Sequence, residues 1–231
     1  MGFWSSVGSA ISGGISAIGS ACSSIGSALS SACSSVLSGI SSAVTNLAPV
    51  LNALAIVIPQ AGLLGKVVLA IEVLSIFIGV MDKDDKIEDI GDRAIQANEA
   101  GIRPEDFGSY KEYMTAIKNF ELDPQKSEKI SATEKMIAGV GVQYWGFEET
   151  LGSGDIIVKT LTSPDYFTRE RLITFLDKVD SIQEVIAYFD GKLSKSERLP
   201  IEEKLVEAEK SLNPNKSDFA IYKELLDHTN E

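Results

Sequence analysis

The sequence predicts a mainly α-helical protein with three parts: a Ser/Gly/Ala-rich amphipathic helix, an apolar helical hairpin and an acidic helical domain. Before Asp82 the only charged side chains are Lys66 and Glu72, so the whole formal net charge of −12 lies in residues 82–231. Small and apolar residues repeat with a helical period over residues 4–45, and no βαβ alternation follows. We therefore expect a membrane-active helical segment at 1–81 and an acidic soluble helical domain at 82–231.

The first element is an amphipathic helix over residues 4–45, in which serine recurs once per helical turn. From Ser5 to Ser41 the serines take ten steps over 36 residues, or 3.6 residues per step, which is the period of a straight α-helix. Helices on the surface of soluble proteins usually carry charges on their polar face, whereas an uncharged hydroxyl face suits a water-filled lumen or close helix packing in lipid. The candidates for lining a pore are Ser9, Ser12, Ser16, Ser20, Ser23, Ser27, Ser34, Ser38 and Ser41.

An apolar stripe follows the same period on this helix. The side chains expected to face lipid are Val7, Ile11, Ile15, Ile18, Ile25, Leu29, Val36 and Ile40. Cys22 and Cys33 lie on this stripe and are interpreted as small apolar fillers, with a link between protomers as the alternative. The glycines, including Gly13 and Gly14, weaken a helix in water. We therefore expect the helix to depend on lipid or a partner; packing on the rest of its own chain is the alternative.

The second element is an apolar helical hairpin at 47–81 with a turn at 59–62. Each half approaches the roughly 20 residues that a helix needs to cross a bilayer core. Pro49, Lys66 and Glu72 argue against permanent residence in a membrane, because an unpaired charge at its centre is costly. Glu72 is a further pore-lining candidate that would favour cations; an exposed edge of a hairpin in a soluble fold is the alternative. The pattern is typical of a segment that is shielded first and inserts later.

The third element is a series of amphipathic helices after Met81. Seven are predicted, at 85–100, 105–119, 129–150, 165–178, 181–190, 197–211 and 217–228, with a short strand at 155–159. Ser163 and Ser217 are expected to cap helices, and Gly101, Gly152 and Gly191 to follow helix ends. The aromatic side chains are expected to form most of the core: Phe107, Tyr110, Tyr113, Phe120, Tyr144, Trp145, Phe147, Tyr166, Phe167, Phe175, Tyr188, Phe189 and Tyr222.

The residues suited to enzymatic chemistry are few. His228 is the only histidine and lies four residues from the end, so neither a His-based triad nor a His-based metal site is expected. The acidic cluster at 82–88 lacks the glycine and spacing of a calcium-binding loop and is interpreted as a solvated face. We therefore predict no catalytic, cofactor-binding or metal-binding residue, with a carboxylate-based hydrolase as the alternative. The acidic charge also argues against binding to nucleic acid.

Three segments carry a resemblance to a known group of proteins. They are Glu88–Ala97, with the sequence EDIGDRAIQA, Asn119–Pro124, with NFELDP, and Pro164–Thr168, with PDYFT. Together with the Gly/Ser/Ala-rich start and the uncharged hairpin, they resemble small antibacterial pore-forming effectors of the type VI secretion system. The resemblance implies ion leakage through the inner membrane of a target bacterium. It also implies a cognate immunity protein and a secretion tube protein or chaperone that shields residues 1–81.

Taken together, these features predict a secreted antibacterial toxin that inserts residues 4–81 into a target membrane. Several copies would oligomerise there and form an ion-conducting pore that depolarises the cell. The start of the chain has no basic region typical of a signal peptide, so we expect secretion without cleavage and a shielded, soluble state in the producing cell. Two alternatives stay open: a phage or injection-machine protein that associates with or pierces membranes, and a soluble interaction protein whose apolar segment is held by a partner.

Overall fold

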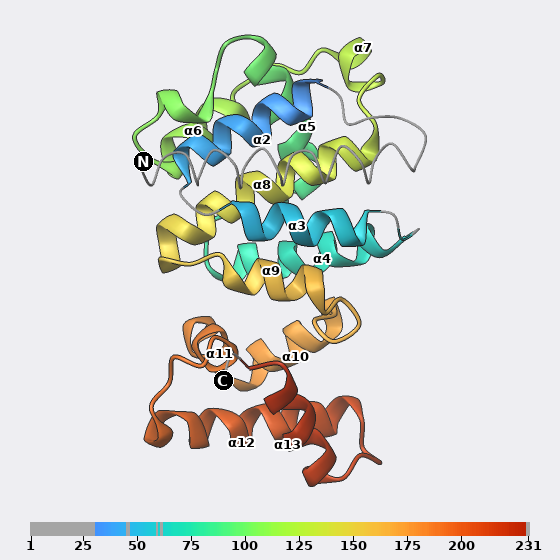
Figure 1. Cartoon of the computed structure of the whole chain (residues 1–231), viewed down its shortest axis with the longest axis vertical. Helices are drawn as coiled ribbons and strands as arrows, with labels where there is room; N and C mark the ends of the chain where they lie inside the picture. The colour runs from blue at the N-terminus through green and yellow to red at the C-terminus, as the bar shows by residue number, and fades with distance from the viewer. Residues whose placement is uncertain (1–30, 45–46, 59, 61, 230–231) are drawn as a thin grey trace, which may run out of the picture.

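The structure is a computed structural model that describes residues 31–44, 47–58, 60 and 62–229 (Figure 1). These residues form twelve α-helices and one short 3-10 helix, without a strand, which confirms the mainly helical fold class. The first helices are α2 (Ser31–Ala43), α3 (Ala48–Val57) and α4 (Leu63–Phe77). They are followed by α5 (Ile87–Glu99), η1 (Pro104–Asp106), α6 (Tyr110–Lys118), α7 (Pro124–Ser127), α8 (Ala132–Leu151) and α9 (Asp155–Thr162). The last are α10 (Arg169–Lys178), α11 (Ile182–Phe189), α12 (Lys195–Leu212) and α13 (Asp218–Asp227).

The helices are stacked along the long axis of the molecule. Figure 1 shows α2, α5, α6 and α8 at one end, α3, α4 and α9 in the middle, and α10 to α13 at the other end. The apolar helices α3 and α4 therefore lie between α2, α5, α6 and α8 on one side and α10 to α13 on the other. This placement supplies partners for apolar side chains on more than one side of each helix.

The two helices of the apolar hairpin begin at residues that favour a helix start. Pro49 lies in the first turn of α3, where a missing backbone N–H costs no hydrogen bond. It therefore starts the helix instead of interrupting it. Gly62 precedes α4 with a φ of 78°, a left-handed conformation that favours glycine over other residues. The hairpin predicted at 47–81 thus contains one helix of 10 residues and one of 15.

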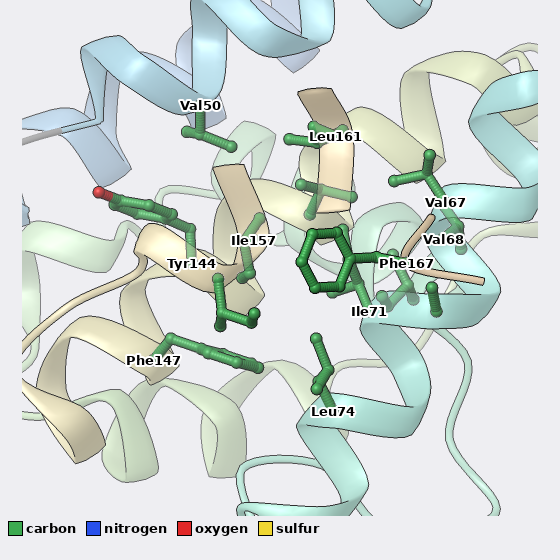
Figure 2. Packing of buried hydrophobic residues seen from close by; sticks show 14 of the residues in the cluster. Val50, Val67, Val68, Ile71, Leu74, Tyr144, Phe147, Ile157, Leu161 and Phe167 are labelled. Carbon is green, nitrogen blue, oxygen red and sulfur yellow. The ribbon is translucent and has the colours of Figure 1, made fainter. Parts of the chain in front are cut away.

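The two hairpin helices pack mainly on helices of the acidic part. α3 contacts α9 and α8, while α4 contacts α10, α8 and α9. Figure 2 shows Ile71 and Leu74 of α4 beside Phe167, with Ile157 of α9 and Phe147 of α8 close by. All five side chains are almost completely buried. The core is therefore shared across the change in composition at residue 82.

α8 is the central helix of the molecule, and its glycines permit close approach of its neighbours. A Cβ at Gly139 would lie 2.1 Å from the Ile87 carbonyl oxygen of α5, and one at Gly141 would lie 2.8 Å from Leu37 Cδ2 of α2. Real Cβ contacts are not that short. α5 therefore packs on α8 at a position where only glycine leaves enough space, whereas at Gly141 the end of the Leu37 side chain would have to shift.

The aromatic core is confirmed for most of its predicted members. Ten of the thirteen are buried: Tyr110, Tyr113, Tyr144, Trp145, Phe147, Tyr166, Phe167, Phe175, Tyr188 and Phe189. Phe107 and Phe120 are half-buried against this core. Tyr222 is exposed on α13, so its assignment to the core was wrong.

Three expectations about local structure require correction. Residues 155–159 form the first part of helix α9, not a strand, since Ile156, Ile157 and Leu161 are buried with helical spacing. The helix expected at 105–119 is divided into η1 and α6. The helix expected at 165–178 begins only at Arg169, because Thr168 caps it by accepting a hydrogen bond from Arg171 N at 3.3 Å. Ser163, which was expected to cap this helix, instead follows the last residue of α9.

Candidate functional site

The serine stripe and the apolar stripe of the predicted N-terminal helix are described only in part. The helix is present at Ser31–Ala43. The following candidates lie outside the described residues: Ser9, Ser12, Ser16, Ser20, Ser23, Ser27, Val7, Ile11, Ile15, Ile18, Ile25 and Leu29. Ser34 and Ser41 lie in α2, but their side chains are also outside the description. Among these candidates, the side chains that the structure describes are therefore those of Ser38, Val36 and Ile40.

Val36 and Ile40 lie on one side of α2, and Ser38 lies on the other. Val36 and Ile40 are completely buried, since α2 packs against α8 and α5. Ser38 is exposed and lines a polar cavity of about 360 Å³ together with Ser35, Asn98, Arg103 and Glu105. In the described state, the apolar stripe of α2 thus faces protein, and Ser38 faces solvent.

Glu72 is held at the start of α5. Its Oε1 accepts a hydrogen bond from the backbone N–H of Ile87 at 2.9 Å. Lys86, which precedes the helix, provides no side-chain cap, and the first N–H groups of a helix otherwise lack partners within it. Glu72 therefore caps α5 from the neighbouring helix α4. No sequence pattern predicts this contact, because the two residues are fifteen positions apart.

Polar contacts hold the loop after α4 against α6. Lys118 Nζ lies 2.6 Å from Asp82 Oδ2 and 2.6 Å from Asp85 Oδ2, while the Tyr110 hydroxyl donates to the Val80 carbonyl at 3.0 Å. Partial burial opposes the positive charge of Lys118, but its hydrogen bonds to the two carboxylates outweigh this effect and raise its pKa. The Lys118 ammonium in turn lowers the pKa of Asp82. Part of the acidic cluster thus attaches the hairpin to the acidic helices.

The hairpin is apolar on its solvent-exposed surface as well as on its buried surface. Leu69 and Phe77 of α4 are 47% and 49% exposed, and Ile56 of α3 is 61% exposed. Lys66 is exposed on the same side of α4 as Leu69, because positions three apart lie on one helix face. α4 is therefore apolar around most of its circumference, although one side meets solvent.

His228 belongs to a stack of aromatic side chains. Its ring stacks on Tyr166 at a centroid distance of 3.8 Å, and the Arg171 guanidinium lies 4.2 Å from the centroid of the same Tyr166 ring. Arg171 Nε also pairs with the buried Glu209 at 2.5 Å. Burial lowers the pKa of His228. These contacts join the end of α13 to the segment before α10, and α10 to α12.

Two further findings concern metals and membranes. Within residues 31–44, 47–58, 60 and 62–229, no three or more His, Cys, Asp or Glu side chains gather where they could hold a metal ion. Across the same residues, each helix is too short or too polar to cross a bilayer.

Comparisons with protein-family models, curated proteins and solved structures gave no match for this chain.

Proposed function

We propose that this protein is a secreted antibacterial toxin that inserts residues 4–81 into a target membrane, oligomerises and conducts ions. The serine stripe, including Ser38, and Glu72 would face the water-filled lumen, and the Val, Ile and Leu stripe would face lipid. The acidic helices would stay outside the bilayer. In the producing cell, a cognate immunity protein and a carrier that shields residues 1–81 would keep the protein harmless.

One observation carries this proposal: α4 is apolar on its buried side and on its solvent side. A helix that is apolar all round fits either the interior of a large protein or a lipid bilayer. In the described state the solvent side of α4, with Leu69 and Phe77, meets neither of these environments. A bilayer would accommodate the whole circumference of the helix, except for Lys66 and Glu72.

Insertion requires a state that differs from the one described. α3 has 10 residues and α4 has 15, whereas a bilayer-spanning helix needs about 20. The sequence provides uncharged extensions, with residues 36–58 on one side of the turn and 63–81 on the other. The polar contacts at Glu72, Val80 and Asp82 would have to break first. They are few, which is compatible with a hairpin that leaves its site on contact with lipid.

Planar bilayer recordings with the purified full chain test this proposal. We expect stepwise currents and, on expression in the bacterial periplasm, loss of membrane potential. Glu72→Gln retains an oxygen that can accept the Ile87 N–H but removes the charge. If Glu72 lines a cation-selective lumen, this variant should show a reversal potential closer to zero under a salt gradient. Glu121→Gln removes an exposed carboxylate outside residues 1–81 and should behave as wild type.

The absence of current at all concentrations would refute the pore. An unchanged reversal potential in Glu72→Gln, with current retained, would remove Glu72 from the lumen but leave the pore intact.

A second candidate is a soluble interaction protein, and the packing of α3 and α4 favours it. Both helices contribute fully buried side chains to a core shared with α8 and α9, such as Leu54 and Ile71. Such a protein would stay monodisperse without detergent and would leave membrane potential unchanged in both compartments. The same recordings therefore separate the two functions.

A further inference from the structure

Glu72 is the one carboxylate in the segment that is proposed to enter the membrane. Residues 1–81 contain two charged side chains, Lys66 and Glu72. In the folded protein Glu72 is half-buried, and its Oε1 accepts a hydrogen bond from the Ile87 N–H at 2.9 Å. An ionised acceptor makes a stronger hydrogen bond than a neutral one, and a negative charge is favourable at the start of a helix. The ionised form of Glu72 therefore strengthens the contact between α4 and α5.

The surroundings of Glu72 contain charges of both signs. The charges that act on it most strongly are Lys86, which precedes α5, Asp89 in the first turn of α5, and Arg169 at the start of α10. Within the described residues, the other helices that pack on α4, namely α8 and α9, bring no charge of larger effect. The two cations favour the ionised form of Glu72, whereas Asp89 and partial burial oppose it. When α4 leaves this site, the carboxylate loses both cations and the Ile87 N–H.

Glu72 also lies at the middle of the segment that would cross the membrane. It follows Leu63 by nine residues and precedes Met81 by nine, so a straight helix would place it about 14 Å from either end. The hydrocarbon core of a bilayer is about 30 Å thick. Lys66 is six positions away, which puts it on a different side of the helix and about 9 Å along the axis. An ionised carboxylate without a partner is costly at this depth, and its protonated form costs less.

We propose that Glu72 is a proton-dependent gate for insertion, since the hairpin leaves its site and enters the bilayer once this carboxylate takes up a proton from water. Protonation weakens the hydrogen bond with Ile87 and the attraction to Lys86 and Arg169. The same proton removes the charge that opposes entry into lipid. After the pore has assembled, Glu72 would meet the water of the lumen and release the proton there. The inference rests on the proposed function and adds the condition under which insertion occurs.

Proton uptake determines the direction and the size of the pH dependence. The inserted state contains the additional proton, so insertion should increase as the pH falls. If one proton is bound by each chain, the ratio of inserted to folded protein changes by up to about tenfold per pH unit. A chain that lacks the Glu72 carboxylate should lose this dependence.

Insertion into vesicles of phosphatidylcholine, which carries no net charge, tests the gate with the full chain at pH 7 and pH 5. The measured quantity is the fraction of protein that floats with the vesicles and resists extraction by urea at the same pH. Circular dichroism without vesicles checks that each variant is folded at both pH values.

Three variants separate the charge of Glu72 from its contact. Glu72→Gln removes the titrating group but retains an oxygen that can accept the Ile87 N–H. Glu72→Asp retains the charge but shortens the side chain and weakens the contact. Glu121→Gln, the control, removes an exposed carboxylate outside residues 1–81.

We expect the ratio of inserted to free wild type to be up to about a hundredfold higher at pH 5 than at pH 7. Glu72→Gln should insert about equally at both pH values, and at pH 7 more than wild type. Glu72→Asp and Glu121→Gln should keep the wild-type dependence on pH.

Three results would overturn the gate. These are equal insertion of wild type at the two pH values, a wild-type pH dependence in Glu72→Gln, and insertion of Glu72→Asp at pH 7 as extensive as that of Glu72→Gln. Current from wild type whose insertion does not depend on pH leaves the proposed pore standing. Insertion that depends on pH and on Glu72 without any current supports the gate and refutes the pore.

Discussion

Asp92 is a buried carboxylate that forms an ion pair. Its side chain is 6% exposed and pairs with Lys135 Nζ at 2.8 Å. It also accepts hydrogen bonds from Gln96 Nε2 at 2.9 Å and from the Ser127 hydroxyl. Burial alone would raise the pKa of Asp92, but the hydrogen bonds and the Lys135 ammonium outweigh it and lower the pKa below its usual value. The carboxylate thus joins α5, α7 and α8.

Replacement of this carboxylate should destabilise the protein in a pH-dependent way. Asp92→Asn removes the charged partner of Lys135, which keeps only its hydrogen bond to the Ser127 hydroxyl. Breaking a buried ion pair costs about 3 kcal/mol or more. Because the folded-state pKa of Asp92 is depressed, its contribution is present above the unfolded-state pKa of about 4. It is lost as the pH falls through the lower folded-state value. The difference in the free energy of unfolding between wild type and Asp92→Asn should therefore be largest near pH 7 and become smaller below about pH 4.

Urea denaturation at a series of pH values measures this difference. Asp84→Asn, an exposed carboxylate in the loop before α5, serves as the control and should change the free energy of unfolding little at any pH. A constant difference between wild type and Asp92→Asn from pH 7 to pH 3 would contradict the role assigned to the carboxylate.

At the scale of elements, the crossing of α5 and α8 depends on two glycines. A Cβ at Gly91 would lie 1.8 Å from the Lys135 carbonyl oxygen, and one at Gly139 would lie 2.1 Å from the Ile87 carbonyl oxygen. Both contacts are with backbone, which cannot move aside as the end of a side chain can. The two helices are therefore in direct backbone contact, and α5 holds the Ile87 N–H, which donates to Glu72, at a fixed place.

Gly139→Ala should separate these helices and reduce the free energy of unfolding by about 1–3 kcal/mol, the usual range for overpacking. Gly65→Ala is the matched control in α4, since a Cβ there meets nothing within 4 Å. It should stabilise the protein by up to about 1 kcal/mol, because alanine favours a helix over glycine. Chemical denaturation measures both variants. If both variants changed the free energy of unfolding by the same amount and in the same direction, the crossing of α5 and α8 would not require glycine.

Sequence patterns identified helices well where caps and periodicity agreed. Ser217 caps α13 as expected, and Gly101, Gly152 and Gly191 follow helix ends with positive φ. Residues 155–159 were misread because Ile156, Ile157 and Val158 favour strands locally. The buried positions of the whole element, which extends to Thr162, follow a helical period. The short helix α7 was not predicted, since it depends on the Asp123 side chain accepting from Gln125 N at 2.9 Å.

The sequence predicts the candidate site less completely than it predicts the helices. Composition alone identified the uncharged segment, and Glu72 and Ser38 were recognised as unusual polar residues on it. Their surroundings could not be predicted, because the Glu72–Ile87 hydrogen bond and the cavity that Ser38 lines with Asn98 and Arg103 form only after the helices pack. The outward exposure of Leu69 and Phe77 is also a result of packing. A helix that is apolar all round gives no sequence signal for which side remains in solvent.

At the scale of the whole molecule, the hydrophobic core continues across residue 82, where the sequence changes from uncharged to acidic. α3 and α4 contact α8, α9 and α10, and Ile71 and Leu74 lie beside Phe167 in Figure 2. Complete burial of one such side chain contributes about 1.5–3 kcal/mol. The net stability of a domain is only about 5–15 kcal/mol. We therefore expect the acidic helices to depend on the hairpin for folding, since its removal would leave them with an uncovered apolar surface.

This dependence predicts the behaviour of residues 82–231 expressed alone. Without α2, α3 and α4, the side chains of Phe147, Ile157 and Phe167 lose their neighbours, and the fragment should bind the dye ANS and melt without a sharp transition. The fragment 31–231, which retains every described helix, is the control and should unfold in one cooperative step. Calorimetry and dye binding on both fragments measure the difference. If residues 82–231 melted as sharply as fragment 31–231 and at the same midpoint, the acidic helices would be an independent domain, and release of the hairpin would cost them nothing.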